Sequence, residues 1–213
     1  MKRLLLSIAI LFSMYSCKEE EKKQEVESPE LTVAEEIANA HGYANWDKVK
    51  SFAFTFGGAI EDPNSGRSWV WYPKSNDVTL TTSTDTVSYN RNAMDSIALK
   101  SDPAFINDKF WALIPFQLVW DEGITISESE MAISPVAQDS LNKIVIVYGD
   151  EGGYTPGDAY DIYFDNDYMV REWSFRKGNS PEPSLSNTFE NYSDYNGIKV
   201  AQDHIFKGSG RNL

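Results

Sequence analysis

Short segments in which large apolar side chains occupy every second position recur along this chain, and they constrain its fold more than any other feature. In the segment 51–56, Phe52, Phe54 and Phe56 fall on one side, because successive side chains of a strand point to opposite faces. Trp69 and Trp71 repeat this spacing in the next such segment. Both segments are therefore predicted to be strands with one strongly apolar face.

The alternation continues well beyond these two segments. Two further segments carry threonine and serine on their open face, and a third is apolar on both faces, which suits a central strand. These predicted strands are 77–81, 85–89 and 143–148.

Two polar, turn-rich stretches predict hairpins. The triplet Asp165-Asn166-Asp167 separates the apolar segments 159–164 and 169–175, and residues 193–197 separate 187–192 from 198–206. Aspartate, asparagine and glycine favour tight turns. Connections this short leave no room for crossover helices, so an antiparallel meander is expected.

Two stretches break the alternation and predict helices. Thr32 and Glu35 form a capping box at the start of the first, which ends near His41-Gly42 with Val33, Ile37 and Ala40 on its buried side.

Asp102 and Pro103 are a typical helix start, and they predict a second helix through residue 113. Pro115 should stop or kink it before a short apolar segment, 116–120, that is helical or irregular. Few helices among many strands predict the α+β class, with one curved antiparallel sheet, an N-terminal helix and one or two mid-chain helices.

The N-terminus carries a secretory signal. Met1-Lys2-Arg3 precedes an apolar run, 4–14, that is too short to span a bilayer. The residues Met14-Tyr15-Ser16-Cys17 resemble a bacterial lipobox, and Cys17 is the only cysteine. Residues 1–16 are thus predicted to be a signal peptide and Cys17 the lipidated first residue of the mature chain. The alternative is ordinary cleavage near this point, with Cys17 left as a free thiol.

Residues 17–30 are dense in charge and are predicted to be a disordered acidic tether. A lysine followed by several acids after the lipidated cysteine resembles the signal that one group of Gram-negative bacteria uses to display lipoproteins on the outer face of the outer membrane. The alternatives are a plain solvated linker and the periplasmic face. We expect a single β domain at 31–206, followed by a C-terminal tail at 207–213.

The chain is acidic, with a formal net charge of −13. Such a charge repels phosphate backbones and anionic lipid heads, so nucleic acid is not expected as a partner. Membrane association is expected through the lipid anchor. A monomer without cofactor or metal is predicted.

Several of these features together resemble a known family. A helix ending in His41-Gly42, the stretch Asn45-Trp46-Asp47-Lys48-Val49, the stretch Phe110-Trp111-Ala112-Leu113-Ile114-Pro115-Phe116 and a closing meander are similar to an uncharacterised family of exported bacterial lipoproteins. That family resembles the lipoprotein-carrier fold, a half-barrel around helices on its concave side that leaves an apolar groove. The resemblance covers most of 31–206 and implies a fold; it carries no catalytic or ligand-binding residue to this chain.

Large aromatic side chains are the best candidates for a binding site. On a concave sheet and its covering helix they would line a pocket for an acyl chain or a sugar ring. For any one tryptophan, core packing is the alternative. The candidate ligand-binding residues are Trp69, Trp71, Trp111, Phe116, Trp120 and Trp173.

Motifs of catalysis are missing from the sequence: it has no Gly-x-Ser-x-Gly elbow, no phosphate-binding glycine loop and no Cys/His cluster. His41 and His204 are its only histidines, and each is predicted to be structural. Asp158, Asp161 and Asp165 lie close in sequence but lack the glycine of a calcium loop, so an acidic hairpin turn is predicted.

Three functions remain open at this point. The first is a non-catalytic binding module for a hydrophobic or amphipathic molecule. The second is an interaction or scaffold subunit at the cell surface, which requires an exposed apolar patch. The third is a glycan hydrolase with two carboxylates facing each other across a cleft.

Overall fold

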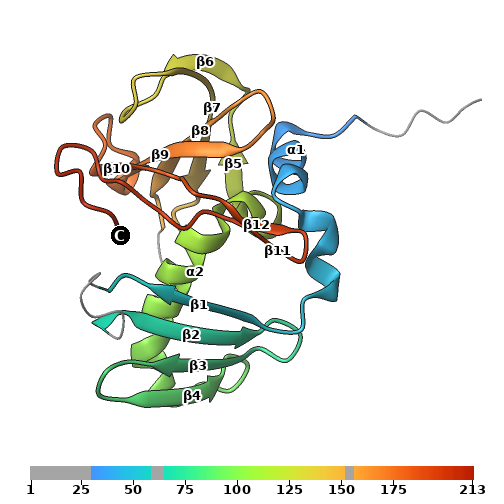
Figure 1. Cartoon of the computed structure of the whole chain (residues 1–213), viewed down its shortest axis with the longest axis vertical. Helices are drawn as coiled ribbons and strands as arrows, with labels where there is room; N and C mark the ends of the chain where they lie inside the picture. The colour runs from blue at the N-terminus through green and yellow to red at the C-terminus, as the bar shows by residue number, and fades with distance from the viewer. Residues whose placement is uncertain (1–29, 59–64, 152–155) are drawn as a thin grey trace, which may run out of the picture. The chain divides into compact units, whose positions relative to one another are not determined.

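The computed structural model describes residues 30–58, 65–151 and 156–213, and residues 31–213 form one compact unit (Figure 1). The predicted signal peptide, Cys17 and all of the predicted tether except Glu30 lie outside the described residues.

The first four strands form an antiparallel sheet in simple sequence order, β1-β2-β3-β4. Short turns join β2 to β3 and β3 to β4, and each strand pairs with its neighbour in the chain. The bounds are β1 Phe52–Phe56, β2 Arg67–Tyr72, β3 Asp77–Thr81 and β4 Thr86–Asn90.

The later strands form a six-stranded antiparallel sheet in the order β10-β9-β8-β7-β5, with β6 also paired to β7. The doubly apolar strand β7 is interior, as predicted for its segment. A separate hairpin pairs β11 with β12. The bounds are β5 Ile124–Ile126, β6 Glu130–Ile133, β7 Ser140–Tyr148, β8 Ala159–Phe164, β9 Val170–Arg176, β10 Leu185–Thr188, β11 Ser193–Tyr195 and β12 Ile198–Val200.

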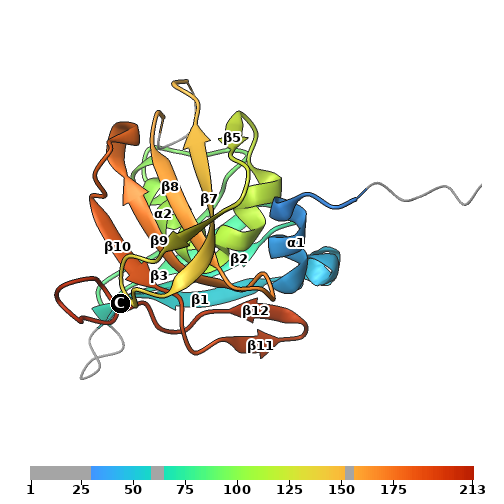
Figure 2. The same ribbon diagram turned by 90° about the horizontal axis from the view of Figure 1, so that it is seen from above.

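The predicted α+β class, with antiparallel sheet and few helices, is confirmed. The structure divides the strands among separate sheets because α2, Ala98–Trp120, comes between β4 and β5 in the chain and packs against strands of both large sheets (Figures 1 and 2). Alternation identifies strands and their apolar faces, but it does not say which strands share a sheet.

Helix α2 differs from its prediction at its start and follows one of the two predicted alternatives at Pro115. It starts one turn earlier, where Asp95 Oδ1 accepts hydrogen bonds from the backbone N–H groups of Ile97 and Ala98 at 2.9 and 2.8 Å. Asp102 is therefore not the N-cap but a buried residue of the helix. Pro115 kinks rather than ends the helix: Leu113 has φ −127° and ψ 27°, and the chain stays helical to Trp120.

Helix α1, Val33–Ala40, follows its prediction closely. The capping box is present, with the Thr32 N–H donating to Glu35 Oε2 at 2.8 Å, and His41 is the C-cap. The buried side consists of Ala34, Ile37 and Ala38; the prediction was right for Ile37, whereas Val33 and Ala40 are only partly buried.

A short 3-10 helix, Tyr43–Lys48, follows Gly42. Gly42 has φ +93°, and a Cβ there would lie 1.7 Å from the carbonyl oxygen of Gly197. Only glycine allows this approach, which brings the end of α1 against the β11–β12 turn. The turn itself is tighter than predicted, because residues 193–195 belong to β11 and pair with β12.

Two apolar clusters share α2. Toward the six-stranded sheet, Trp111, Ile114 and Leu118 pack with inward residues of β7, β8 and β9. Toward the four-stranded sheet, Phe105 and Phe116 pack in the cluster that contains the β2 tryptophans. The helix is thus apolar on two opposite sides, as expected for a helix between two sheets.

The predicted C-terminal tail is part of the domain, which corrects the boundary at 206. The Lys207 N–H donates to Ser186 O at 2.9 Å, and the Leu213 N–H donates to His204 O at 3.2 Å. Leu213 also packs against the cluster on the six-stranded sheet. These contacts explain why the segment folds back rather than leaving the domain.

Candidate functional site

The six predicted aromatic residues do not form one site. Trp69, Trp71 and Phe116 are buried core residues that line neither of the two clefts described below, so their predicted role in binding is not supported by their position. Trp111, Trp120 and Trp173 do come together at one cleft. Alternation correctly predicted the inner face for the three candidates on strands, Trp69, Trp71 and Trp173. Over β2, however, α2 covers that face and buries both tryptophans.

The cleft that contains these three tryptophans, here called the α2 cleft, lies along one side of α2 and has a volume of about 760 Å³. Residues from α2, its C-terminal loop and strands β7 to β10 contribute to it. Its lining comprises Arg91, Pro103, Ile106, Asn107, Lys109, Phe110, Trp111, Gln117, Trp120, Asp121, Glu122, Gly123, Tyr148, Gly149, Glu151, Tyr160, Trp173, Phe175 and Leu185.

Packed aromatic rings form the sheet side of the α2 cleft. Tyr160 and Phe175 are cross-strand partners on β8 and β9, with ring centroids 5.1 Å apart. Phe110 reaches over from α2 to 4.7 Å from Tyr160 and 5.6 Å from Trp173. Tyr160 and Phe175 meet because every second residue of β8 and β9 points to the inner face of the sheet, and the two residues lie opposite each other. The result is a broad apolar wall on rigid elements.

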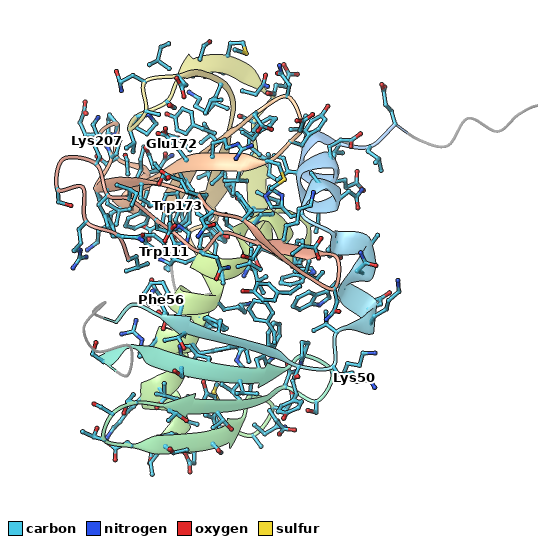
Figure 3. The ribbon with its side chains drawn as sticks, in the orientation of Figure 1. Lys50, Phe56, Trp111, Glu172, Trp173 and Lys207 are labelled. Atoms are coloured by element: carbon cyan, nitrogen blue, oxygen red, sulfur yellow. The ribbon has the colours of Figure 1, made fainter. Side chains whose placement is uncertain are left out.

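Trp173 belongs to this wall, and Trp111 packs edge-on against it with ring centroids 4.6 Å apart (Figure 3). Glu172 precedes Trp173 on β9 and lies on the opposite face of the sheet (Figure 3). It accepts hydrogen bonds from Ser134 Oγ at 2.9 Å and from the backbone N–H of Val136 at 2.6 Å, which holds the β6–β7 connection on the outer face. Glu172 therefore has a structural role.

Charged groups gather on the helix side of the same cleft. The Nζ atom of Lys109 lies 5.4 Å from the ring centroid of Trp71 and 5.8 Å from that of Trp120. Burial lowers the pKa of Lys109 to about 8, and the nearby Asp121 carboxylate opposes this shift. Burial in turn raises the pKa of Asp121, although Tyr148 donates a 2.6 Å hydrogen bond to it.

A second cleft, here called the β1 groove, has a volume of about 670 Å³ and runs along the edge strand β1. Its opposite wall comes from the β11–β12 hairpin and the C-terminal residues. Its described lining includes Lys48 and Lys50 but no acidic residue, in contrast to the α2 cleft. Phe56, at one end of β1, contacts Trp111 with centroids 5.8 Å apart, so this tryptophan reaches both clefts (Figure 3).

Three carboxylates are buried in the described part of the chain, and each has structural partners. Asp108 accepts two hydrogen bonds from Arg67, both 2.7 Å, and one from Trp69 Nε1 at 2.8 Å. Arg91 binds Asp102 at 2.8 Å. Together with Glu172, these residues are engaged in fixing the fold rather than facing a cleft as a catalytic pair.

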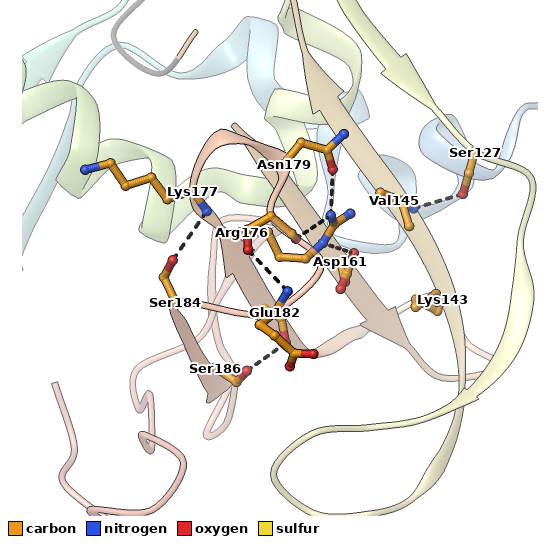
Figure 4. A network of polar contacts seen from close by, with 12 residues as sticks. Ser127, Lys143, Val145, Asp161, Arg176, Lys177, Asn179, Glu182, Ser184 and Ser186 are labelled. Carbon is orange, nitrogen blue, oxygen red and sulfur yellow. Dashed lines mark hydrogen bonds and ion pairs between the residues drawn. The ribbon is translucent and has the colours of Figure 1, made fainter. Parts of the chain in front are cut away.

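The acidic residues around the β8–β9 hairpin also have structural partners. Asp165 accepts from the backbone N–H of Asp167 at 2.9 Å and pairs with Arg171 at 2.6 Å, so the hairpin prediction is confirmed. Asp161 pairs with Arg176 at 3.0 Å, within a surface network that also includes Asn179 (Figure 4).

Both histidines are structural, as predicted. His41 is fully buried; its Nδ1 lies 2.8 Å from Ile37 O, and the Val170 N–H donates to its Nε2 at 3.4 Å. His204 Nδ1 lies 3.0 Å from Thr188 O. Within residues 30–58, 65–151 and 156–213, no group of three or more His, Cys, Asp or Glu side chains is arranged to hold a metal ion.

Sequence reasoning missed Lys109. The available signal was helical spacing: Lys109 and Trp120 are eleven residues apart, which corresponds to about three turns and places both on one side of α2. Pro115 was predicted to stop or kink the helix, and only the kinked alternative keeps Lys109 and Trp120 on one helix.

No helix in the described residues is both long enough and apolar enough to cross a membrane. Comparison of the chain with protein-family models, curated proteins and solved structures finds no match.

Proposed function

We propose that this protein is a lipid-anchored binding module that holds a hydrophobic or amphipathic molecule in the α2 cleft. The observation that carries this proposal is the aromatic wall of Phe110, Tyr160, Trp173 and Phe175 beside a cavity of about 760 Å³. Binding sites for small molecules range over about 300–1,000 Å³ and are lined mainly by apolar side chains with a few polar groups. The α2 cleft has this size, and ten of its nineteen lining residues are aromatic or aliphatic, with charged and amide side chains among the rest.

The anchor in this proposal is Cys17, acylated after removal of residues 1–16. Its support is the lipobox-like sequence and the absence of any other cysteine. The acidic residues after Cys17 support display on the outer face of the outer membrane. Mass spectrometry of the mature N-terminus tests the anchor, and digestion of intact cells with an added protease tests the display.

The binding proposal is tested with N-phenyl-1-naphthylamine, a neutral apolar dye whose fluorescence rises in apolar surroundings. The protein is the mature chain from residue 17, with Cys17→Ser so that no acyl chain competes, and it is stripped of lipid. We expect saturable binding that dodecanol displaces. Leu185→Trp, which enlarges a side chain of the cleft lining, should weaken binding at least fivefold.

Leu99→Trp is the matched control, because Leu99 is 57% exposed on α2 and lines neither cleft. Its affinity should equal that of the parent protein. Equal effects of the two substitutions, or no saturable binding by the parent protein, would refute binding in the α2 cleft.

One observation favours an interaction subunit as a second candidate. Met131 and Ile133 lie on the same side of β6, and each is 61% exposed. Replacing both with serine should abolish co-purification with an outer-membrane partner while leaving dye binding unchanged. Unchanged co-purification would remove this candidate.

A further inference from the structure

Lys109 is a half-buried ammonium group that lacks an ionic partner in the described part of the chain. Every ion pair within 4.0 Å among these residues involves other side chains; Lys109 makes two cation–π contacts and interacts with the Asp121 carboxylate only at longer range. Removing a charge from water without a counter-charge is costly. The described residues therefore place a positive charge at the cleft that no carboxylate contacts directly.

The charged groups around Lys109 have other partners. Arg91 and Asp102 bind each other at 2.8 Å, and Asp121 accepts the Tyr148 hydroxyl at 2.6 Å. Glu122 and Glu151 also line the cleft, but both are exposed, where solvent and salt screen them. Lys109 is thus the cation of the lining that is free to bind an added anion.

A second unmatched donor lies next to Lys109. The Trp71 ring beneath its ammonium group has a buried Nε1 with no hydrogen-bond partner among the described residues. Trp71 does not itself line the cleft. This unsatisfied donor lies next to the cleft rather than in its wall, so it adds to the positive character beside Lys109 without itself contacting a ligand.

The apolar wall lies across the same cleft from this charge. Phe110 follows Lys109 on α2 and packs on Tyr160 and Trp173. A molecule that fills the cleft therefore meets a cation at the helix and aromatic rings at the sheet. This arrangement fits a molecule with one anionic end and one apolar end.

We propose that Lys109 binds the anionic head group, a carboxylate or a phosphate, of an amphiphile whose alkyl chain lies against the aromatic wall of the α2 cleft. This inference rests on the proposed function and adds the chemical class of the ligand to it.

The experiment compares four probes that share a twelve-carbon chain: dodecanoate, dodecyl phosphate, dodecanol and dodecyltrimethylammonium. Binding to the lipid-free mature chain with Cys17→Ser is measured by calorimetry at pH 7, below the concentration at which each probe forms micelles. Charge-assisted hydrogen bonds contribute roughly tenfold or more in affinity. We expect both anions to bind at least tenfold more tightly than dodecanol, and the ammonium probe to bind most weakly; the ratio of the two anions identifies the preferred head group.

Lys109→Met keeps the length of the side chain and removes its charge. It should weaken binding of both anions about tenfold and leave dodecanol unchanged, whereas Lys109→Arg should retain the preference. Lys100→Met is the matched control, since Lys100 is an exposed residue of α2 outside the cleft. Anion binding by the parent protein should also weaken above pH 8, where Lys109 loses its proton, and this dependence should vanish in Lys109→Met.

Equal affinity for dodecanol and dodecanoate, or an unchanged preference in Lys109→Met, would overturn the head-group assignment and leave binding in the cleft intact. Failure of all four probes to bind would overturn the proposed function and this inference together.

Discussion

The two sides of α2 meet their sheets through different kinds of contact. Toward the four-stranded sheet, the fully buried Asp102 and Asp108 bind arginines from that sheet or its border. Toward the six-stranded sheet, the described residues of α2 form no ion pair and contribute aromatic and aliphatic packing. Ion pairs fix the position of a helix because they are directional, whereas packing tolerates gaps. The α2 cleft reaches this packed side through Phe110, Tyr160 and Trp173.

The largest expected effect tests the ionic side. Arg67→Met leaves the Asp108 carboxylate buried with Trp69 and Asn107 as its side-chain donors among the described residues. We expect the free energy of unfolding in urea to fall by about 3–4 kcal/mol, in the lower part of the range for buried pairs that lose one partner, because Arg67 is itself 40% exposed. The double variant Arg67→Met with Asp108→Leu should recover much of this loss. A double variant as unstable as the single one would show that the ion pair is not the source of stability.

The second prediction concerns pH and the packed side, where His41 joins α1 to β9. Burial lowers the pKa of His41 from 6.5 to about 4. Because the unfolded chain takes up the proton first, the stabilisation is complete above pH 6.5 and is lost as the pH falls from 6.5 to 4, by about 3 kcal/mol.

Protonation would place an N–H at Nε2, against the donating N–H of Val170. Urea unfolding measured from pH 7 to pH 4 should therefore show a smaller pH dependence in His41→Gln than in the parent protein. His204→Gln serves as a comparison in which His41 is retained. An unchanged slope in His41→Gln would contradict this account.

A third, smaller effect is expected within the aromatic packing. Trp173→Leu creates a cavity beside Trp111 and leaves Asn187 Oδ1 without its indole donor. We expect a loss of about 2 kcal/mol, equal at pH 5 and pH 8 relative to the parent protein, since no charge is involved. A loss of stability that depends strongly on pH would show that charged groups also contribute to the contacts between α2 and the six-stranded sheet.

The smallest effect is expected at the start of α1, which packs on the six-stranded side. Thr32→Ala removes the side-chain cap while Glu35 remains. The cost should be about 1 kcal/mol in thermal or urea unfolding. Thr82→Ala, in the exposed β3–β4 turn, is a control for loss of a threonine hydroxyl that hydrogen-bonds the backbone outside a helix. A loss at Thr32 no greater than that at Thr82 would argue against the cap.

Local signals predicted local structure well here. The capping box at Thr32 and the Asp165-Asn166-Asp167 turn act within a few residues, so their outcome is nearly independent of the rest of the chain. Asp102 was misjudged because a cap and a buried ion-pair partner look alike in sequence: both are an aspartate before an apolar stretch. The partner, Arg91, became informative only once β4 and α2 were placed side by side.

The candidate site was predicted in part for a similar reason. The alternation of apolar residues correctly predicted that Trp69 and Trp173 lie on the inner faces of their sheets. Whether an inner face borders a cavity depends on how α2 crosses it, and no pattern within a strand contains that information. Lys109 escaped notice because its position at the cleft, and the lack of a carboxylate within ion-pair distance of it among the described residues, depend on three-dimensional packing.

The packed C-terminus has a practical consequence for work on this protein. Leu213 lies at the mouth of the β1 groove, and its backbone is tied to His204. An affinity tag or fluorescent label fused after Leu213 would therefore crowd the groove. It would also weaken the backbone hydrogen bond that joins Leu213 to His204. Reporters are better inserted in the exposed turn between β3 and β4, at 82–85, on the far edge of the four-stranded sheet from β1.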